Sequence, residues 1–410
     1  MKKVLYIAFF AIFFPALFIG CGEDRTKEFF EQTKENQWIY TTMRSHYLWS
    51  NQIKPQERSK FFVPSSNFFS SLLYKEDKAS FYSDAVYKGD YGMNVVLKRD
   101  PINVIPSQVY ALVLSVEPGS PADKAGIRRG TWISAVNGKK LSMSSASLLQ
   151  NGDEMKLATE YIEYNDAENE RFWVHGDTLT VEASASYDLC DVVMDSVYTE
   201  GGKNIGYILC NRFNNDDFAK RIDGISAKFI NQNVTDVVVD LRYADEGSMS
   251  NVCYLASVLV PSGLEGTPFC TLRKSENEVD AVHGYVRPQY TLCDKKIYFI
   301  TGAATKGVAE LLVSSVNASR DAYDVMTLGE NSAGSNVMVE KMVSPYGFSI
   351  SPATAYVYSS DGAIISNKGI TPDYKIDELA QTGVVYPLGN TQEYVLYNAI
   401  YLISKGALPM

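Results

Sequence analysis

Residues 297–312 combine a buried strand, a tight turn and a helix, and this combination constrains the fold more than any other segment. The sequence is IYFITGAATKGVAELL. Ile297–Thr301 is apolar and β-branched, which is typical of a buried strand. Apolar residues recur at helical spacing over Val308–Leu312, so we expect a helix to begin near Lys306 or Gly307. The N–H groups and the helix dipole at such a turn stabilise negative charge.

The same alternation of strands and helices continues over residues 187–410. Further strands are expected at Ile205–Cys210, Val234–Leu241 and Val325–Gly329, and helices at Phe218–Asn231, Val252–Leu259 and 386–405. This order predicts a layered α/β core with a largely parallel sheet, followed by a C-terminal helix.

Residues 86–186 carry a different pattern, rich in strands and tight turns. Its signals are a strand at Val109–Val116, a short helix capped by Ser120 with Pro121 at its first position, a left-handed helix end at Gly126, a strand at Trp132–Val136 and a hairpin turn at Asn137-Gly138. The series resembles a PDZ domain. The resemblance implies that an extended peptide is bound as an added strand, with its terminal carboxylate held by backbone N–H groups.

The peptide-binding loop and edge strand of such a domain are expected at Tyr91, Gly92, Met93, Asn94 and Val95. The family usually has a second glycine where Asn94 stands, and asparagine tolerates a left-handed backbone better than most residues. Two interpretations stay open, a groove that binds peptides and a spacer whose groove is filled by its own chain.

The strand–turn–helix segment resembles the corresponding part of the carboxy-terminal-processing, or tail-specific, serine peptidases that carry a PDZ domain. In that family the segment reads roughly S-x-S-A-S-E-L, with the nucleophile three residues before the Glu. Here the Glu is Glu310, so the nucleophile position is Gly307. The family's lysine base ends the motif G-E-x-T-x-G-K, which corresponds here to residues 329–335, so the base position is Ser335. Both members of the Ser/Lys dyad are therefore absent.

A third motif of the family, D-L-R-x-N-x-G-G, supplies backbone groups for the oxyanion site. It corresponds here to Asp240–Gly247, a degenerate oxyanion region in which the Asn is Ala244 and one Gly is Glu246. Together with Asp245, Glu246 adds negative charge ahead of Gly247, and negative charge there opposes a tetrahedral oxyanion. Gly369–Asp373 also matches a G-x-x-P-D motif of the family, so the resemblance covers nearly the whole mature chain.

The resemblance implies a multidomain α/β protein. It has an N-terminal helical domain at 22–85, a PDZ-like β-rich domain at 86–186 and a layered peptidase-like core at 187–410 that resembles the tail-specific protease fold. Because the dyad is degenerate, we predict a non-catalytic pseudopeptidase that binds extended or C-terminal peptide segments of envelope proteins. Two alternatives are an active endopeptidase with displaced catalytic groups, which would cleave unfolded or tail-exposed proteins, and a structural lipoprotein that is a partner in an envelope complex.

The displaced catalytic groups that the second alternative requires would be Thr305, Lys306 and Ser332. Adjacent helix positions do not face each other, so Lys306 as a base would need a hydroxyl elsewhere. Thr305 is expected instead to be the N-cap of the following helix.

The first residues are typical of a bacterial secretory signal. Lys2 and Lys3 precede the apolar run Val4–Ile19, so 1–20 are predicted to be a signal peptide. The sequence F-I-G-C then ends in Cys21, which resembles the lipidated cysteine of a lipobox. We therefore predict a lipid-anchored protein of the bacterial cell envelope. The acidic residues after Cys21 favour the outer membrane, on a face that the sequence does not determine.

Composition narrows the partners further. The net charge of −10 argues against nucleic-acid binding. The three histidines are far apart in sequence and no cysteine pair has zinc-site spacing, so no metal and no cofactor is expected. A bridge between Cys253 and Cys270 is compatible with an oxidising compartment but is not required by the spacing. The oligomeric state is left open.

Overall fold

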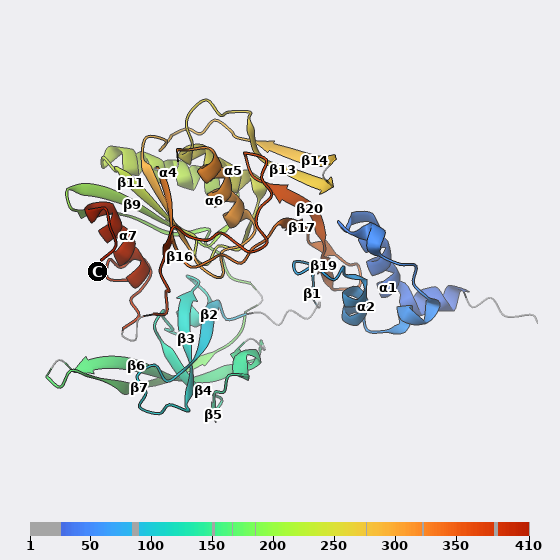
Figure 1. The fold of residues 1–410 in the computed structure, drawn as a ribbon. Helices are drawn as coiled ribbons and strands as arrows, with labels where there is room; N and C mark the ends of the chain where they lie inside the picture. Colours follow the sequence, from blue (N-terminus) through green and yellow to red (C-terminus); the bar gives the residue numbers. More distant parts are fainter. Residues whose placement is uncertain are drawn as a thin grey trace, which may run out of the picture.

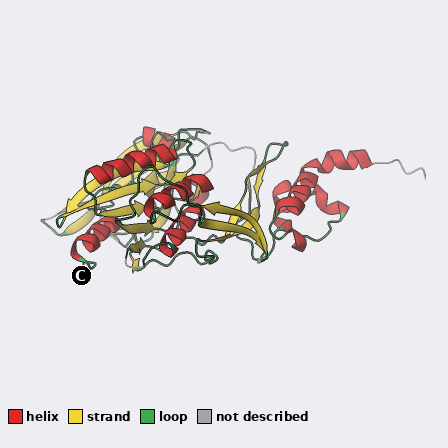
Figure 2. Ribbon diagram, turned by 90° about the horizontal axis from the view of Figure 1, so that it is seen from above, coloured by secondary structure: helices red, strands yellow, loops and turns green. Residues whose placement is uncertain are grey.

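The computed structural model describes residues 26–83, 90–149, 152–165, 167–184, 186–275, 277–321, 324–380 and 384–409. They form a helical N-terminal unit, a β-rich domain and an α/β core, with the helical unit at one end of the molecule (Figures 1 and 2). The predicted signal peptide and Cys21 lie outside the described residues. No described helix is both long enough and apolar enough to cross a membrane.

The N-terminal unit consists of α1 (Thr26–His46), η1 (Ser50–Gln52), η2 (Arg58–Phe62) and α2 (Ser65–Leu72). It packs through one apolar cluster on a small antiparallel sheet of β1 (Phe81–Ser83), β19 (Ser349–Ser351) and β18 (Met342–Val343). The indole N–H of Trp49 donates to the hydroxyl of Tyr356 at 3.0 Å. The unit is therefore attached to the C-terminal half of the chain.

The β-rich domain contains β2 (Met93–Arg99), β3 (Val109–Val116), α3 (Pro121–Lys124), β4 (Trp132–Val136), β5 (Lys139–Lys140), η3 (Ser145–Leu149), β6 (Met155–Asn165) and β7 (Glu170–Val181). Its sheet order is β2-β3-β4-β6-β7, with β5 paired to β4. The local predictions are confirmed: the Ser120 hydroxyl accepts from the N–H of Asp123 at 3.2 Å, and Gly126, Asn137 and Gly138 have φ angles of 85°, 51° and 75°.

The core contains β8 (Val192–Glu200), β9 (Lys203–Cys210), β10 (Arg212–Phe213), α4 (Phe218–Asn231), β11 (Asp236–Asp240), β12 (Glu246–Gly247), α5 (Met249–Leu259), β13 (Pro268–Ser275), β14 (Glu278–Gly284), β15 (Lys296–Thr301), α6 (Val308–Ala318), β16 (Val325–Gly329), β17 (Val337–Val339), β20 (Ala353–Tyr358), β21 (Tyr374–Lys375) and α7 (Tyr394–Lys405). The main sheet has the order β21-β16-β15-β11-β9-β8 and is parallel except for β8. The predicted largely parallel sheet is confirmed.

Helices cover both faces of the main sheet. α4, α5 and α6 pack on one face in one apolar cluster, and α7 packs on the other (Figure 1). The predicted C-terminal helix begins at Tyr394, not at residue 386. A turn with Gly389 at a φ of 79° precedes the helix, and the Glu393 carboxylate caps it by accepting from the N–H of Leu396 at 3.0 Å.

The five described cysteines are all free thiols, so no bridge joins Cys253 to Cys270. Cys253 instead donates from Sγ to the carbonyl of Gly284 at 3.1 Å. Burial is the main reason that the pKa values of both thiols are raised, as is typical of cysteines that pack as small apolar residues.

Candidate functional site

The carboxyl ends of three neighbouring parallel strands bring the three motifs together. In the register of the sheet, the last residue of β11, Asp240, lies beside Ile300, and the last residue of β15, Thr301, lies beside Gly329. The chain segments that follow β11, β15 and β16 therefore leave the sheet at the same edge. Ligand sites in open parallel sheets form at this edge.

Gly307 lies at the turn that follows β15. It is the N-cap of α6, which starts close to the predicted position, and has φ 62° and ψ −119°. This backbone conformation is strained for any residue with a side chain. A strained strand-to-helix turn is also the geometry that presents a nucleophile in hydrolases with a nucleophile elbow. Here the turn has that form and the side chain is missing.

Glu310 links this turn to the segment after β16. The carboxylate is fully buried. Its Oε1 accepts from the Ser332 hydroxyl at 2.5 Å and from the N–H of Gly334 at 2.7 Å. Its Oε2 accepts from the N–H groups of Gly307 at 3.1 Å and Ser335 at 2.8 Å. Three backbone N–H groups and one hydroxyl thus satisfy both oxygens of this buried carboxyl group.

The two positions predicted to have lost the dyad therefore lie side by side. The backbone nitrogens of Gly307 and Ser335 are no more than about 6 Å apart, because both donate to the same carboxylate oxygen. A long amine at position 335 would thus be within reach of a hydroxyl at position 307. Ser335 itself carries no amine.

The hydroxyls considered as displaced nucleophiles are both occupied. Thr305 is fully buried, and its hydroxyl donates to the carbonyl of Leu241 at 2.7 Å and accepts from the N–H of Gly302 at 2.9 Å. The expectation that Thr305 caps α6 is wrong, because it instead closes the turn before the helix. The Ser332 hydroxyl donates to Glu310 and accepts from the N–H of Ile370 at 2.6 Å.

The region predicted to be a degenerate oxyanion site lies against the same turn. The Ala244 carbonyl accepts from the N–H of Lys306 at 3.1 Å, and a methyl group added at Gly307 would meet the Asp245 carbonyl oxygen at 3.7 Å. The group that a side chain at position 307 would meet is thus an acceptor, which does not stabilise an oxyanion. Lys306 extends toward solvent, half exposed, with Nζ 3.6 Å from the Asp245 carboxylate.

The remaining residues of this region have structural contacts. Glu246 is exposed at its side chain, which lies 3.5 Å from the Arg212 guanidinium. Gly247 pairs with Phe213 so closely that a methyl group there would lie 2.4 Å from the phenylalanine side chain. Only glycine fits this position without a shift of the backbone.

A cleft of about 1390 Å³ opens above Gly307. One wall comes from the N-terminal unit, including Trp49 and Tyr74. Other lining residues come from the start of α6 and from Ser335–Val339, which includes β17. β17 is an edge strand of the four-stranded sheet with the order β14-β13-β20-β17. The cleft therefore runs along an edge of this sheet.

The candidate peptide loop of the β-rich domain differs from the expectation. Tyr91 is buried in the domain core, and its hydroxyl donates to the carbonyl of Asp153. Asn94 lies within β2, is not among the residues with a left-handed backbone, and donates from its amide to the Ser115 hydroxyl at 2.8 Å. The left-handed conformation considered for Asn94 is therefore not needed.

Gly92 has the left-handed conformation of this loop, with φ 70°. Its N–H donates to the carboxylate of Asp90 at 2.9 Å, and the same oxygen accepts from the hydroxyl of Tyr187 at 2.6 Å. Met93 and Val95 belong to β2, which is an edge strand of its sheet. An internal carboxylate thus already lies beside the loop, where its charge opposes a second carboxylate from a peptide.

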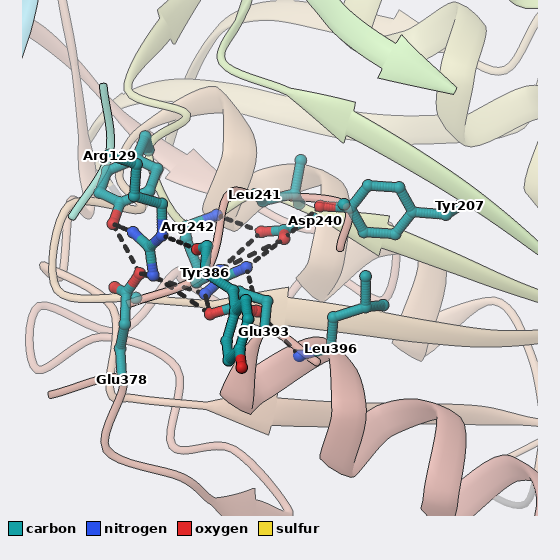
Figure 3. Close-up of polar contacts among 12 residues, drawn as sticks. Arg129, Tyr207, Asp240, Leu241, Arg242, Glu378, Tyr386, Glu393 and Leu396 are labelled. Carbon is teal, nitrogen blue, oxygen red and sulfur yellow. Dashed lines mark hydrogen bonds and ion pairs between the residues drawn. The ribbon is translucent and has the colours of Figure 1, made fainter. Parts of the chain in front are cut away.

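A buried cluster of charges supports the whole arrangement (Figure 3). Arg242 is 1% exposed and pairs with Asp240 at 2.7 Å, Glu393 at 2.8 Å and Glu378 at 3.1 Å. Arg129, which precedes β4 in the β-rich domain, pairs with Glu378 at 2.6 Å and with Glu393 at 3.1 Å. The two arginines join the β-rich domain, the end of β11 and the start of α7.

The charges in this cluster hold one another ionised. Burial alone would raise the pKa of Glu393, but the charges of Arg242 and Arg129 and the hydrogen bonds from Arg242 outweigh it and lower that pKa. Burial likewise disfavours the charged form of Arg242, and the three carboxylates raise its pKa well above the ordinary value. Glu393 therefore stabilises the fold above the ordinary pKa of a glutamate, and this contribution falls as the pH drops through the lowered value.

The sequence does not reveal this cluster. Arg242 belongs to the motif at Asp240–Gly247, but the sequence indicates a site role only for Ala244–Gly247 within that motif. Arg129 and Glu393 are far apart in sequence and carry no local signal that pairs them. Within the described residues, no group of three or more His, Cys, Asp or Glu side chains is placed to hold a metal ion.

Comparisons with known proteins agree with this architecture. Residues 204–376 match "Peptidase family S41", residues 34–84 match "Peptidase S41 N-terminal domain" and residues 112–158 match "PDZ domain". The chain belongs to peptidase family S41.

Two curated relatives carry the names of proteases. A "Probable CtpA-like serine protease" of Staphylococcus aureus (strain N315) is 24% identical over 75% of this chain and 57% of its own length. A "Carboxyl-terminal-processing protease" of Picosynechococcus sp. is 21% identical over 73% of this chain and 67% of its own. The chain thus matches little more than half the length of the Staphylococcus relative.

Solved structures share the fold. A putative S41 protease from Bacteroides fragilis NCTC 9343 has a TM-score of 0.75 at 24% identity and covers 90% of this chain and 97% of its own. The photosystem II D1 C-terminal processing protease has a TM-score of 0.54 at 14% identity and covers 92% of this chain and 98% of its own. Both confirm the predicted fold of a helical N-terminus, a PDZ-like domain and a tail-specific-protease core.

We expect Arg242→Met to lower the free energy of unfolding by about 3–5 kcal/mol, because it leaves buried carboxylates unpaired. Urea denaturation measures the change. The matched control is Arg128→Met: this arginine is 62% exposed in its side chain and pairs with Asp123, so the loss should stay under about 1 kcal/mol. Equal effects from the two substitutions would contradict a supporting role for the cluster.

We expect Gly307→Ala to destabilise the protein by about 1–3 kcal/mol through backbone strain alone, because the added methyl group has room. The control is Gly224→Ala on the exposed face of α4, where no atom lies within 4 Å and the helical backbone favours alanine. There the change should stabilise by about 0.5–1 kcal/mol. If both substitutions shift the urea midpoint in the same direction, the strained turn is not a property of the folded protein.

Proposed function

We propose that this protein is a non-catalytic member of family S41 that binds extended or C-terminal peptide segments of cell-envelope proteins without cleaving them. The observation that carries the proposal is the pair of positions joined by Glu310. Gly307 has the backbone of a nucleophile turn but no side chain, and Ser335 has no amine. A serine peptidase of this kind needs a hydroxyl next to an amine with a lowered pKa.

An active enzyme with displaced groups is less well supported. The hydroxyls of Thr305 and Ser332 are each engaged in two hydrogen bonds inside the protein. Lys306, the residue before Gly307, is half exposed beside Asp245, whereas the lysine base of such an enzyme is buried. No observation specifically favours a purely structural role.

The cleft is the site that we assign to the peptide. β17 is an edge strand of its sheet and Ser335–Val339 line the cleft, so a segment that adds to β17 as a further strand would lie in the cleft that Trp49 and Tyr74 also line. The aromatic rings cover apolar side chains, and backbone hydrogen bonds provide affinity with little dependence on sequence. The edge of β2 is a second position for strand addition, where Asp90 disfavours a free carboxylate at the adjacent loop.

We further propose that Cys21 carries a lipid that holds the protein at a bacterial membrane, with the outer membrane as the expected site. The support is the order of the first residues: a basic start, a short apolar run and F-I-G-C. Mass spectrometry of the membrane fraction should recover an N-terminal peptide that begins at Cys21 with added acyl mass. A Cys21→Ser form should be released from the membrane, and an unmodified peptide that continues upstream of Cys21 would contradict the assignment.

We expect the mature protein to bind unfolded polypeptide segments and to leave them intact. Calorimetry measures binding, and mass spectrometry of the recovered peptide detects cleavage. Ala333→Trp places an indole in the cleft and should weaken binding at least about tenfold, the equivalent of about 1.4 kcal/mol. Ala363→Trp, at an exposed position outside the cleft, should leave the affinity unchanged.

The test has two arms that separate its parts. Cleavage by the unaltered protein would refute a non-catalytic role, and unchanged affinity in Ala333→Trp would refute the cleft as the binding site. A double variant, Gly307→Ser with Ser335→Lys, should gain slow cleavage, because the two positions lie within reach of each other. No gain would mean that the oxyanion region has also lost its function, in line with the acceptor group of Asp245 at the site.

A further inference from the structure

An exposed aromatic surface lies at the free end of the N-terminal unit. Phe30 on α1 is 52% exposed, and Phe62 and Val63 at the end of η2 are 55% and 38% exposed. Phe29 lies between them, with its ring centroid 5.9 Å from that of Phe30 and 5.7 Å from that of Phe62. These four residues therefore form one surface, here called the terminal aromatic surface, although they come from two separate elements.

Charges of both signs surround the terminal aromatic surface. The Arg58 guanidinium lies 5.4 Å from the centre of the Phe29 ring. The other charged side chains nearby in sequence are exposed: Lys27, Glu28, Glu31, Glu57 and Lys60. The mixture gives no strong attraction to a ligand of one sign. It suits a zwitterionic surface, where long basic side chains cover apolar area and reach phosphate groups.

The position of this surface in the chain indicates what covers it. α1 begins at Thr26, five residues after Cys21, so a lipid on Cys21 is at most about 18 Å of extended chain away from the helix. Phe30 follows about one helical turn further on. Figures 1 and 2 both show the start of α1 at one end of the molecule, on the side opposite to α7. A lipid anchor therefore brings this end to the bilayer before any other part.

We propose that the terminal aromatic surface docks on the phospholipid headgroup region of the membrane that holds the lipid anchor, with Phe30 and Phe62 inserted at that level. The proposal rests on the lipid anchor proposed above. The short tether gives the bilayer a high effective concentration, so a small apolar surface that would not bind membranes alone can dock. Docking holds the N-terminal unit at the membrane and turns the α/β core away from it. Because the rim charges are mixed, docking should not require anionic lipid.

The test replaces the native anchor so that it does not depend on lipidation. The full mature chain, with six histidines in place of Cys21, is attached to phosphatidylcholine vesicles that contain a nickel-chelating lipid. Phe62→Trp and Tyr161→Trp are compared on vesicles with and without brominated phosphatidylcholine, after the signal of the parent protein is subtracted. Tyr161 is a matched control because it is 41% exposed and lies on β6, in a different domain.

We expect loss of emission from the new indole in Phe62→Trp, no change in Tyr161→Trp, and the same result when anionic lipid or salt is added. A double variant, Phe30→Ser with Phe62→Ser, should restore fast amide exchange over residues 58–64 on vesicles without altering exchange in solution. Equal quenching at both positions, or none at either, would overturn the proposal. Dimerisation in solution that buries Phe62 would overturn it as well, because a second copy would then be the occupant. Failure to find acyl mass on Cys21 would instead refute the anchor alone.

Discussion

The buried cluster of Arg242, Arg129 and three carboxylates is the interaction on which the relative placement of domains depends. Each charge is costly to bury alone, and together they are satisfied only when the β-rich domain, the end of β11 and the start of α7 meet in one arrangement. This requirement fixes the direction in which the chain leaves β11 toward residues 244–247. The wall of the cleft is therefore set by electrostatics outside the cleft.

Glu310 likewise positions two segments of the chain, over shorter distances than the arginine cluster. Its carboxylate holds the start of α6 and the segment after β16 through backbone N–H groups, which are present whatever side chains those positions carry. The backbone geometry at positions 307 and 335 is thus independent of the side chains that these positions carry. A chain that loses the nucleophile and the base can keep the shape of the site, because no catalytic side chain contributes to the contacts that maintain it.

Local patterns predicted the elements that depend on local physics. The β-branched run Ile297–Thr301 and the turn at Asn137-Gly138 were predicted from period and turn chemistry, and both are where expected. The sequence could not predict contacts between distant residues, such as those of Arg129 with Glu393 or of Tyr187 with Asp90. The prediction that Thr305 caps α6 was wrong for the same reason. Its hydroxyl donates to the carbonyl of Leu241, in the segment that follows β11, and does not bond to α6.

The residue at the turn also bears on how a binding protein arises from a peptidase. A side chain at φ 62° and ψ −119° costs folding energy, and an enzyme tolerates that cost because the nucleophile must point into the cleft. In the non-catalytic protein that we propose, glycine relieves this strain and leaves the turn in place. The aromatic residues that line the cleft and β17, at the edge of its sheet, do not depend on the side chain at position 307 and would remain available to an extended chain. In the function that we propose, loss of chemistry and retention of binding are compatible, because the strain concerns the turn at position 307 and not the walls of the cleft.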